Sequence, residues 1–278
     1  MDDRLIELLD AGFDAAGPVV VMTGAGISAD SGIPTFRGEE GYWTVGSENH
    51  HPMEMATHAA FERMPEQVWR WYLYRRSVCR GAEPNDGHRA LVRLEEALGD
   101  RFLLITQNVD GLHLRAGSSM ARTYQIHGNI DFMRCEGERP AHLRKIPLEI
   151  GEDWTRETPF TDHARRLLAC CPGGAMARPH VLWFDECYDE ELFHFESSIR
   201  AATSAALLIV IGTSGSTNLP MQVGAIVAQR GAPMIVINRD ESPFSEFAER
   251  SASGWFARGP ASEHLPAMVE HLLGRAGA

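Results

Sequence analysis

The stretch "TGAGISADSGIPTFRG" (residues 23–38) follows directly on the apolar run "PVVVM" (residues 18–22). The apolar run has the length of a buried strand, and Gly24 and Gly26 would let the backbone after it turn tightly and approach a phosphate closely. The N-terminus of a helix beyond the turn would add free N–H groups and the positive end of a dipole. An ordinary strand-to-helix turn is the competing interpretation. The third glycine of a dehydrogenase fingerprint is missing, which argues against an ordinary hydride-transferring enzyme.

Four further segments repeat this form, in which an apolar run ends in small or polar residues. They are "RFLLITQN" (101–108), "RPHVLWF" (178–184), "AALLIVIGTSGS" (205–216) and "APMIVINRD" (232–240). Helical spacing predicts helices over residues 2–13, 86–98 and 261–273, with Asp86 as a candidate N-cap. Strands that alternate with helices predict an α/β fold, with a doubly wound, Rossmann-like parallel sheet. The polar strand ends of such a sheet converge on one site.

Two stretches interrupt this alternation, one rich in aromatic residues and histidine and the other in arginine, proline, glutamate and cysteine. We expect them to form a smaller inserted module of residues 38–79 and 131–177. The larger domain then comprises residues 1–37, 80–130 and 178–278.

The composition excludes several classes of protein. The 278 residues are 44% hydrophobic, which is enough for a sizeable core, and 26 Lys+Arg against 38 Asp+Glu give a net charge of −12. This charge argues against nucleic-acid binding, because few cations would neutralise phosphates. No apolar run approaches the roughly 20 residues of a membrane helix. The acidic start lacks a signal-peptide pattern, so we expect a cytoplasmic protein. Five cysteines without such a signal argue against a disulfide framework, and buried thiols are the default for Cys79 and Cys187.

The opening string, read as "GAGISADSGIPTFRG", resembles the nucleotide-binding segment of the sirtuins, the NAD-dependent protein deacylases. Five more segments resemble sirtuin motifs in family order. They are "TQNVDGLHLRAG" (106–117), "IHGN" (126–129), "RPHVLWFDE" (178–186), "IGTSGSTNLP" (211–220) and "VINRD" (236–240). The resemblance implies that the larger domain binds NAD.

The resemblance also implies which residues contact the cofactor. Those of the glycine segment and its flexible loop are Gly24, Ala25, Gly26, Ile27, Phe36 and Arg37. Those of the nicotinamide pocket are Gln107, Asn108 and Asp110. Those of the adenosine side are Gly212, Thr213, Ser214, Asn238 and Arg239.

The catalytic residues implied by the resemblance are His127, Asn108 and Asp110. In the family chemistry the acyl oxygen of an acyl-lysine attacks the ribose carbon as nicotinamide leaves, and a histidine with a pKa near neutral then removes a proton from a ribose hydroxyl. Asn108 would position water or an amide, and Asp110 would help to hold the cofactor. The products are free lysine, nicotinamide and O-acyl-ADP-ribose. A core or surface role competes for His127, one of 12 histidines, and a helix N-cap competes for Asp110.

The segment "VLWFDE" (181–186) is expected to lie beside an acyl-lysine peptide bound by strand addition, with Val181, Trp183 and Phe184 in contact with it. Many sirtuins have glycine where Asp185 stands, so this position departs from the family pattern.

Tyr72 and Arg75 bear on which acyl group is removed. They form Y-x-x-R on a predicted helix, where positions i and i+3 share a face. A guanidinium beside a phenol suits a terminal carboxylate. Sirtuins with this pattern resemble the subgroup that removes succinyl and related acidic groups. The sequence therefore predicts succinyl or malonyl removal, with acetyl removal as a further activity. The competing interpretation is that Arg75 and Arg76 are solvated helix residues and that Tyr72 packs against the core.

Most sirtuins hold a structural zinc with two C-x-x-C pairs. Here the pairs read "CEGE" (135–138) and "CCPG" (170–173), so only Cys135 and Cys170 of the four expected ligands are present. We expect a small module without zinc. The residues that could still complete a site are Cys171, His142 and His163.

Two other functions remain open on the same sequence. One is mono-ADP-ribosyl transfer or NAD hydrolysis on the same fold, and the other is nucleotide binding without turnover. The complete catalytic string argues against the second of these.

Overall fold

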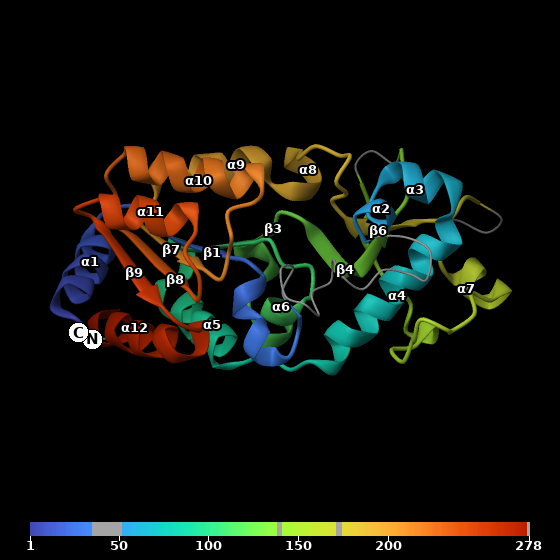
Figure 1. Cartoon of the computed structure of the whole chain (residues 1–278), viewed down its shortest axis with the longest axis horizontal. Coiled ribbons are helices and arrows are strands. Elements are labelled where there is room, and N and C mark those ends of the chain that lie inside the picture. Colours follow the sequence, from blue (N-terminus) through green and yellow to red (C-terminus); the bar gives the residue numbers. More distant parts are fainter. Residues whose placement is uncertain (35–51, 138–140, 171–173, 277–278) are drawn as a thin grey trace.

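The computed structural model describes residues 1–34, 52–137, 141–170 and 174–276. These residues form two parts that lie side by side along the long axis of the molecule (Figure 1). The larger part contains a six-stranded sheet and both chain ends, and the smaller part contains a three-stranded sheet with its own helices.

Parallel strands make up the whole of the larger sheet. In order across the sheet they are β3 (Thr123–Gln125), β2 (Phe102–Thr106), β1 (Val19–Thr23), β7 (Leu207–Ile211), β8 (Met234–Asn238) and β9 (Gly254–Arg258). The strand order changes direction between β1 and β7, which is where ligands bind in open α/β sheets. The predicted doubly wound parallel sheet is confirmed, whereas β3 and β9 were not predicted.

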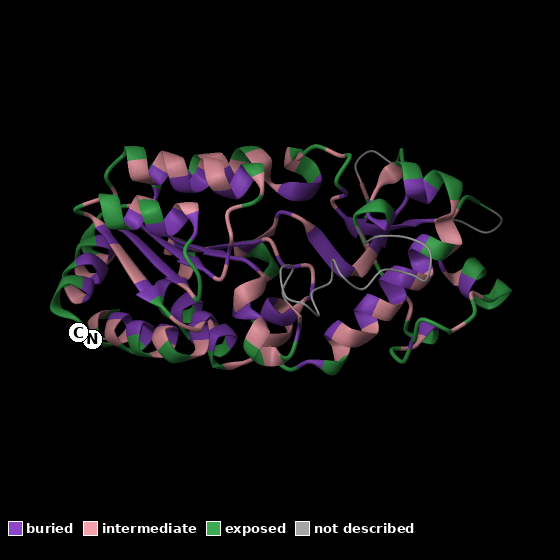
Figure 2. Cartoon of the chain, in the orientation of Figure 1, coloured by how far each residue is buried: buried purple, intermediate pink, exposed green. Residues whose placement is uncertain are grey.

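Helices cover both faces of this sheet, as Figure 1 shows. On one face lie α1 (Asp3–Asp14), α5 (Asp86–Leu98) and α12 (Ala261–Ala276), and on the other α9 (Phe195–Ser204), α10 (Asn218–Gln229) and α11 (Pro243–Arg250). Side chains of a strand alternate between faces, so Val19 and Val21 pack into the first core, and Val20 and Met22 into the second. Both faces of the central strands are therefore buried (Figure 2).

Side chains at the helix starts determine where two predicted helices begin. Asp2 accepts the backbone N–H groups of Arg4 and Leu5 at the start of α1. The N-cap of α5 is Asn85, not Asp86 as predicted. Asn85 accepts from the backbone at the start of the helix, while the His88 ring accepts the Asn85 N–H, which completes a capping box.

The smaller part packs helices against an antiparallel sheet. Its helices are α2 (Pro52–Met55), α3 (His58–Arg63), α4 (Pro65–Gly81) and α7 (Asp162–Leu167), and its strands, in sheet order, are β5 (Arg144–Lys145), β4 (Gly128–Arg134) and β6 (Arg178–Val181). Two short helices, α6 (Leu112–Ala116) and α8 (Glu190–Phe193), follow the ends of β2 and β6.

The expectation that residues 178–184 add a strand to the parallel sheet is wrong. Only Arg178–Val181 is a strand, and it pairs antiparallel with β4, with Met133 opposite Pro179. Proline has no N–H to donate, and β6 lies at the edge of its sheet, where that loss is tolerated. An apolar run alone does not say which sheet it joins, so the sequence could not distinguish the two placements.

Cys135, just after β4, is joined to Cys170 by a disulfide, with 5.5 Å between their Cα atoms. The expectation against disulfides therefore fails for this pair, since an odd cysteine count does not exclude a single bridge. Cys79 is buried as expected, whereas Cys187 is exposed.

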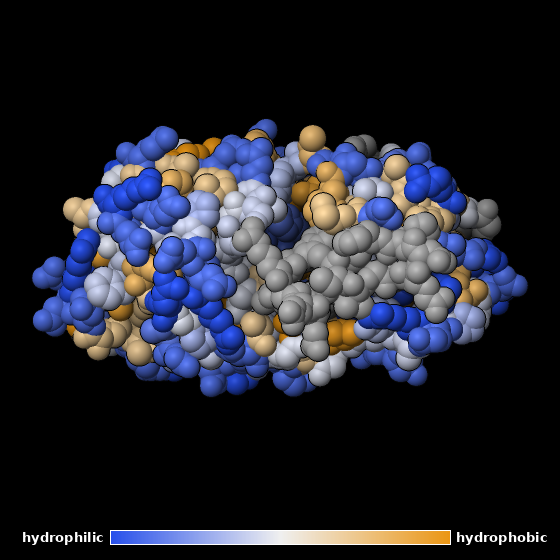
Figure 3. Space-filling model, in the orientation of Figure 1, coloured by the Kyte–Doolittle hydropathy of each residue, from blue (hydrophilic) through white to orange (hydrophobic). Residues whose placement is uncertain are grey.

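Within the described ranges, no helix is both long and apolar enough to cross a membrane. Hydrophilic residues cover much of the face in Figure 3, in line with the net charge of −12. The same view is hollowed near its centre, beside the position of β3 in Figure 1.

Candidate active site

The glycine turn after β1 packs directly against the loop after β7. Gly24 donates its N–H to Ile211 O at 2.9 Å, and Gly26 donates to Gly212 O at 2.8 Å. A Cβ atom on Gly26 would lie 2.5 Å from the Gly212 Cα, so a side chain cannot be accommodated there. The tight turn is confirmed. The close approach that these glycines allow in the structure is between the loop after β1 and the loop after β7.

The predicted helix beyond this turn is not an α-helix over the described residues. It consists of two 3₁₀ turns, Ala25–Ile27 and Ala29–Ser31. The N–H groups of Gly26 and Ile27 bind Gly212 O and Gly24 O, so they do not point outward. The expected helix dipole therefore does not contribute to this site. Phe36 and Arg37 lie outside the described residues.

Side chains from the ends of β1 and β2 form a buried hydrogen-bonded group. Ser28 donates to the Asp110 carboxylate at 2.7 Å, and the Asn108 amide donates to Ser28 Oγ and to Gly24 O, both at 3.1 Å. Asp110 also accepts the Leu112 N–H at 2.9 Å, so it binds the start of α6 as well. Burial raises the pKa of Asp110, against the lowering effect of these hydrogen bonds. Asn108 and Asp110 are thus held in fixed orientations.

His127 follows β3 and has both ring nitrogens engaged. Its Nδ1 lies 3.0 Å from Gln107 O, and its Nε2 lies 2.7 Å from the Tyr188 hydroxyl. A carbonyl only accepts, so Nδ1 carries the proton and Nε2 carries the lone pair. Burial lowers the pKa of His127 to about 4, while the Gln107 carbonyl acts in the opposite direction. The imidazole is therefore neutral at pH 7 and can accept a proton at Nε2, with a lower pKa than the near-neutral one expected.

Gln107 connects this histidine to the loop after β7. Its side-chain amide donates to Thr213 Oγ1 at 2.9 Å and accepts from Thr217 Oγ1 at 3.1 Å. Its backbone N–H donates to Thr23 O at 2.9 Å. Strands β1, β2 and β7 therefore hold one continuous polar surface at their carboxyl ends.

The residues predicted for the adenosine side lie at the ends of β7 and β8. Asn238 donates to Thr213 O at 3.1 Å, and Ser214 is partly buried beside them. Arg239 forms an ion pair with Asp30 at 2.6 Å, which ties the β8 end to the glycine segment.

The chemistry of these groups fits a dinucleotide. Hydroxyl and carboxamide side chains suit ribose hydroxyls and the carboxamide of nicotinamide. The residues that could hold NAD are Gly24, Ala25, Gly26, Ile27, Gln107, Asn108, Asp110, Gly212, Thr213, Ser214, Asn238 and Arg239.

The smaller part contributes a second group around Trp183. The indole N–H of Trp183 donates to Tyr72 Oη at 2.9 Å, and the Arg75 guanidinium lies 4.6 Å from the Trp71 ring centroid and 5.7 Å from that of Tyr72. Tyr72 and Trp183 are about 1% exposed and Arg75 is 7% exposed. Burial raises the pKa of Tyr72 to about 12, although the Arg75 charge opposes this, so the phenol keeps its proton at neutral pH.

The segment after β6 links this group to the histidine. Leu182 donates its N–H to His127 O at 3.0 Å, directly before Trp183 in the chain. Val181 is buried, whereas the Phe184 side chain is 52% exposed and its N–H binds Ala56 O at 3.0 Å. Of the predicted peptide-contacting residues, Phe184 therefore faces solvent and the others pack inward.

Arg178 and Glu186 hold Trp183 in place. The Arg178 guanidinium lies 3.4 Å from the Trp183 ring centroid and is bound by Glu186, which also accepts the Trp183 N–H at 2.9 Å. Sequence reasoning did not single out this pair, nor Ser28, Thr217 and Tyr188. Arg178 and Glu186 lie within "RPHVLWFDE" (178–186), so their place in that motif is the one sequence signal that could have identified them.

Asp185, the residue that departs from the family pattern, binds α3. Its carboxylate accepts the N–H groups of His58 at 2.8 Å and Ala59 at 3.2 Å. Desolvation acts to raise the pKa of Asp185, but these hydrogen bonds outweigh it, and the pKa lies below its ordinary value. The additional charge is directed at a helix start and not at the expected peptide.

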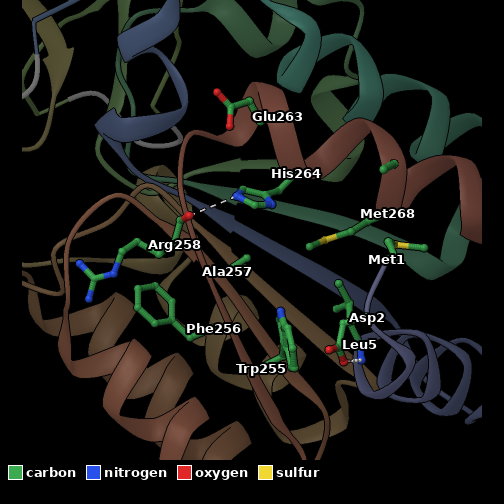
Figure 4. A pocket seen from close by; sticks show the side chains of 11 residues that line it. Met1, Asp2, Leu5, Trp255, Phe256, Ala257, Arg258, Glu263, His264 and Met268 are labelled. Atoms are coloured by element: carbon green, nitrogen blue, oxygen red, sulfur yellow. Dashed lines mark hydrogen bonds between the residues drawn. The ribbon is translucent and has the colours of Figure 1, made fainter.

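The described ranges contain no group of three or more His, Cys, Asp or Glu side chains placed to hold a metal ion. Cys135 and Cys170 are bonded to each other, and Cys171 lies outside those ranges. A separate pocket, shown in Figure 4, lies between β9, α12 and the start of α1. Its lining includes Trp255, Arg258 and His264 but none of the predicted site residues.

Fold and site together define an α/β nucleotide-binding protein with a second, smaller sheet beside the carboxyl ends of its strands. The Sir2 family profile matches residues 24–218, and the chain belongs to this family. A protein from Leptospira interrogans serovar Lai named NAD-dependent protein deacylase is 40% identical over 256 residues, covering 92% of this chain and 93% of that protein.

Two solved structures share the fold over nearly the whole chain. One, described as a Sir2 homolog–NAD complex, has a TM-score of 0.77 at 33% identity and covers 99% of this chain and 95% of that one. The other, described as a Sir2 variant with a deacetylated peptide and 3′-O-acetyl ADP-ribose, has a TM-score of 0.69 at 25% identity and covers 98% of each chain.

Proposed function

We propose that this chain removes acyl groups that end in a carboxylate, of the succinyl and malonyl type, as well as acetyl groups, from protein lysines. The chain is an NAD-dependent protein deacylase, given its family and the named activity of its relative. Its proposed partners are acyl-lysine peptides, and the proposed products are nicotinamide and O-acyl-ADP-ribose. A Sir2 structure that holds a deacetylated peptide and 3′-O-acetyl ADP-ribose supports both.

The proposed catalytic residues are His127, Asn108 and Asp110. NAD, when bound, supplies the ribose carbon that accepts the acyl oxygen and the ribose hydroxyl that loses a proton. His127 would take that proton at Nε2, because the Gln107 carbonyl keeps the other nitrogen protonated. Asn108 and Asp110, fixed by Ser28, would orient the nicotinamide end without rearranging.

The placement of Arg75 is the observation that carries the acyl preference. Its guanidinium is buried against the rings of Trp71 and Tyr72. The Trp183 indole donates its N–H to the hydroxyl oxygen of this Tyr72. A buried cation stabilises an anion more strongly than an exposed one does, because little water screens the charge. Tyr72 accepts the indole N–H with its oxygen, so its own O–H can donate to an acyl carboxylate. A neutral acetyl group would gain nothing from either residue.

Arg75→Met tests this preference on matched acetyl-lysine and succinyl-lysine peptides. We expect kcat/KM for the succinyl peptide to fall about 100-fold, since truncating one partner of a buried charge pair costs roughly 2–5 kcal/mol. The acetyl rate should change less than about threefold, because its transition state makes no charge contact with Arg75. Tyr72→Phe should lower succinyl turnover about tenfold by removing one donor to an ionised acceptor.

Arg89→Met, at an exposed arginine paired with Asp86 on α5, is the matched control and should leave both rates unchanged. An equal fall for both peptides in Arg75→Met, or no change in either, would contradict the carboxylate role of Arg75. Nicotinamide release that does not depend on an acylated peptide would favour NAD hydrolysis or ADP-ribosyl transfer instead.

A further inference from the structure

Tyr188 contacts the catalytic histidine but belongs to none of the motifs. It lies in the segment between β6 and α8, and its hydroxyl is 2.7 Å from His127 Nε2. Its ring packs 5.8 Å from the imidazole centroid and stacks with Phe195 at 6.4 Å. The phenol is therefore held against the nitrogen that the proposed chemistry uses.

The direction of this hydrogen bond follows from the other ring nitrogen. Nδ1 faces the Gln107 carbonyl, so it donates, and Nε2 of the neutral ring can only accept. Tyr188 is the donor. Burial raises the pKa of Tyr188 to about 12, while nearby Thr217 acts in the opposite direction, so the phenol keeps the proton that it donates. The lone pair of the base is thus occupied by a protein group.

Charged groups near this pair are engaged elsewhere. Burial and the Gln107 carbonyl account for the pKa of His127, with no charged side chain among the causes. On the Tyr188 segment, Glu186 binds Arg178, and Asp189 caps α8 through the Leu192 N–H at 2.7 Å. The ring of His194, at the end of α8, stacks on Tyr124 at 4.5 Å.

The Asp110 carboxylate, on the β2 side of the site, is bound by Ser28 and Leu112. Among the described residues, the Tyr188 hydroxyl is therefore the polar group that contacts His127 Nε2.

We propose that Tyr188 is a positioning residue that reversibly caps the general base His127, and that the hydroxyl on which the base acts must displace the phenol. The proposal rests on the proposed function, in which His127 is the base. While capped, the imidazole keeps its orientation and its neutral form. Displacement has an energetic cost, so the cap weakens binding of NAD to the free enzyme.

Tyr188→Phe removes the hydroxyl and keeps the ring that packs on Phe195. In this variant the pKa of His127, followed by nitrogen-15 NMR of its ring on enzyme without NAD, should rise by about 0.5 to 1 unit. The hydrogen bond that is removed favours the neutral ring, so its loss raises the pKa by the amount that about one hydrogen bond contributes. NAD affinity measured by calorimetry should tighten about two- to tenfold, because no phenol has to be displaced.

Tyr124→Phe, which removes a tyrosine hydroxyl from the ring stacked on His194, is the matched control and should change neither quantity. In the wild type, saturating NAD should shift the His127 Nε2 resonance, which tests displacement without any substitution. Unchanged His127 titration and NAD affinity in Tyr188→Phe would overturn the proposal, and so would an Nε2 resonance that NAD leaves unmoved.

These readouts need no turnover. Deacylation that persists at the wild-type rate in His127→Ala would refute the proposed base alone, while the resonance and titration would still decide whether Tyr188 caps the imidazole.

Discussion

At the scale of single residues, Asp185 shows how a departure from a family pattern can serve the fold. Its carboxylate accepts the first two N–H groups of α3, whose Thr57 N-cap accepts the Ala60 N–H. A carboxylate at a helix N-terminus satisfies otherwise unpaired donors and interacts favourably with the dipole. The segment after Trp183 is thereby tied to the smaller part of the molecule.

Asp185→Ala should lower the free energy of unfolding by about 1 kcal/mol, the usual cost of removing a capping side chain. Asp185→Asn, which keeps one acceptor oxygen, should lower it less. Urea denaturation would measure both. The KM for an acylated peptide should change less than about threefold in both variants, since the carboxylate faces α3. A tenfold change in KM with unchanged stability would show that the carboxylate contacts the peptide instead.

The strand pattern was enough to predict that Asn108 and Asp110 lie at the polar edge of the sheet, because parallel strands end on the same side. His127 was placed there only by its resemblance to a sirtuin motif, since β3 was not predicted. Ser28 and Tyr188 could not be predicted in the same way. The contact between Tyr188 and His127 joins residues 61 positions apart, and it depends on how the segment after β6 crosses the end of β3. A lone serine or tyrosine in a loop carries no periodic pattern that would reveal such a contact.

At the scale of elements, two buried histidines connect α5, α6 and β1. His88 on α5 and His113 on α6 pack with ring centroids 4.8 Å apart, and His113 Nε2 lies 3.0 Å from Thr23 Oγ1. Burial lowers the pKa of His88 to about 4, and burial together with His88 lowers the pKa of His113 well below its ordinary value. The folded protein therefore keeps both rings neutral.

Acid should destabilise the fold through these histidines. The unfolded chain binds protons at each histidine below about pH 6.5, whereas folded His88 does so only near pH 4. Unfolding therefore takes up protons in this window. Each such histidine lowers the free energy of unfolding by about 1.4 kcal/mol for every unit by which the pH falls. Urea denaturation at several pH values between 7 and 5 would show this slope.

His88→Gln isolates one histidine, because glutamine at this position still completes the capping box with Asn85. In this variant the slope of the free energy of unfolding against pH should be smaller by about 1.4 kcal/mol per pH unit. His142→Gln, at an exposed histidine, is the control and should leave the slope as it is. An unchanged slope in His88→Gln would mean that His88 is protonated in the fold.

Element types were easier to predict than element partners. The apolar runs at β1, β2, β7 and β8 join the parallel sheet as predicted, whereas the run at β6 joins β4. Sheet partnership depends on the path of the chain between elements, which a local pattern does not contain. The Cys135–Cys170 pairing escaped prediction for the same reason.

At the scale of the whole molecule, the two sheets meet at His127. The histidine lies between β3 of the larger sheet and β4 of the smaller one, and its carbonyl accepts the Leu182 N–H from the end of β6. Gln107 connects the imidazole to the proposed NAD residues, and Trp183, which donates to Tyr72 in the Arg75 group, directly follows Leu182 in the chain. A single reaction that consumes NAD and an acyl-lysine together requires this arrangement.

The most direct test is to measure nicotinamide release and free lysine together, with NAD and either a succinylated peptide or the same peptide unmodified. We expect release only with the succinylated peptide, with one nicotinamide formed for each lysine freed, and loss of both products in His127→Ala. Equal nicotinamide release with the unmodified peptide, or release without freed lysine, would contradict the deacylase described here.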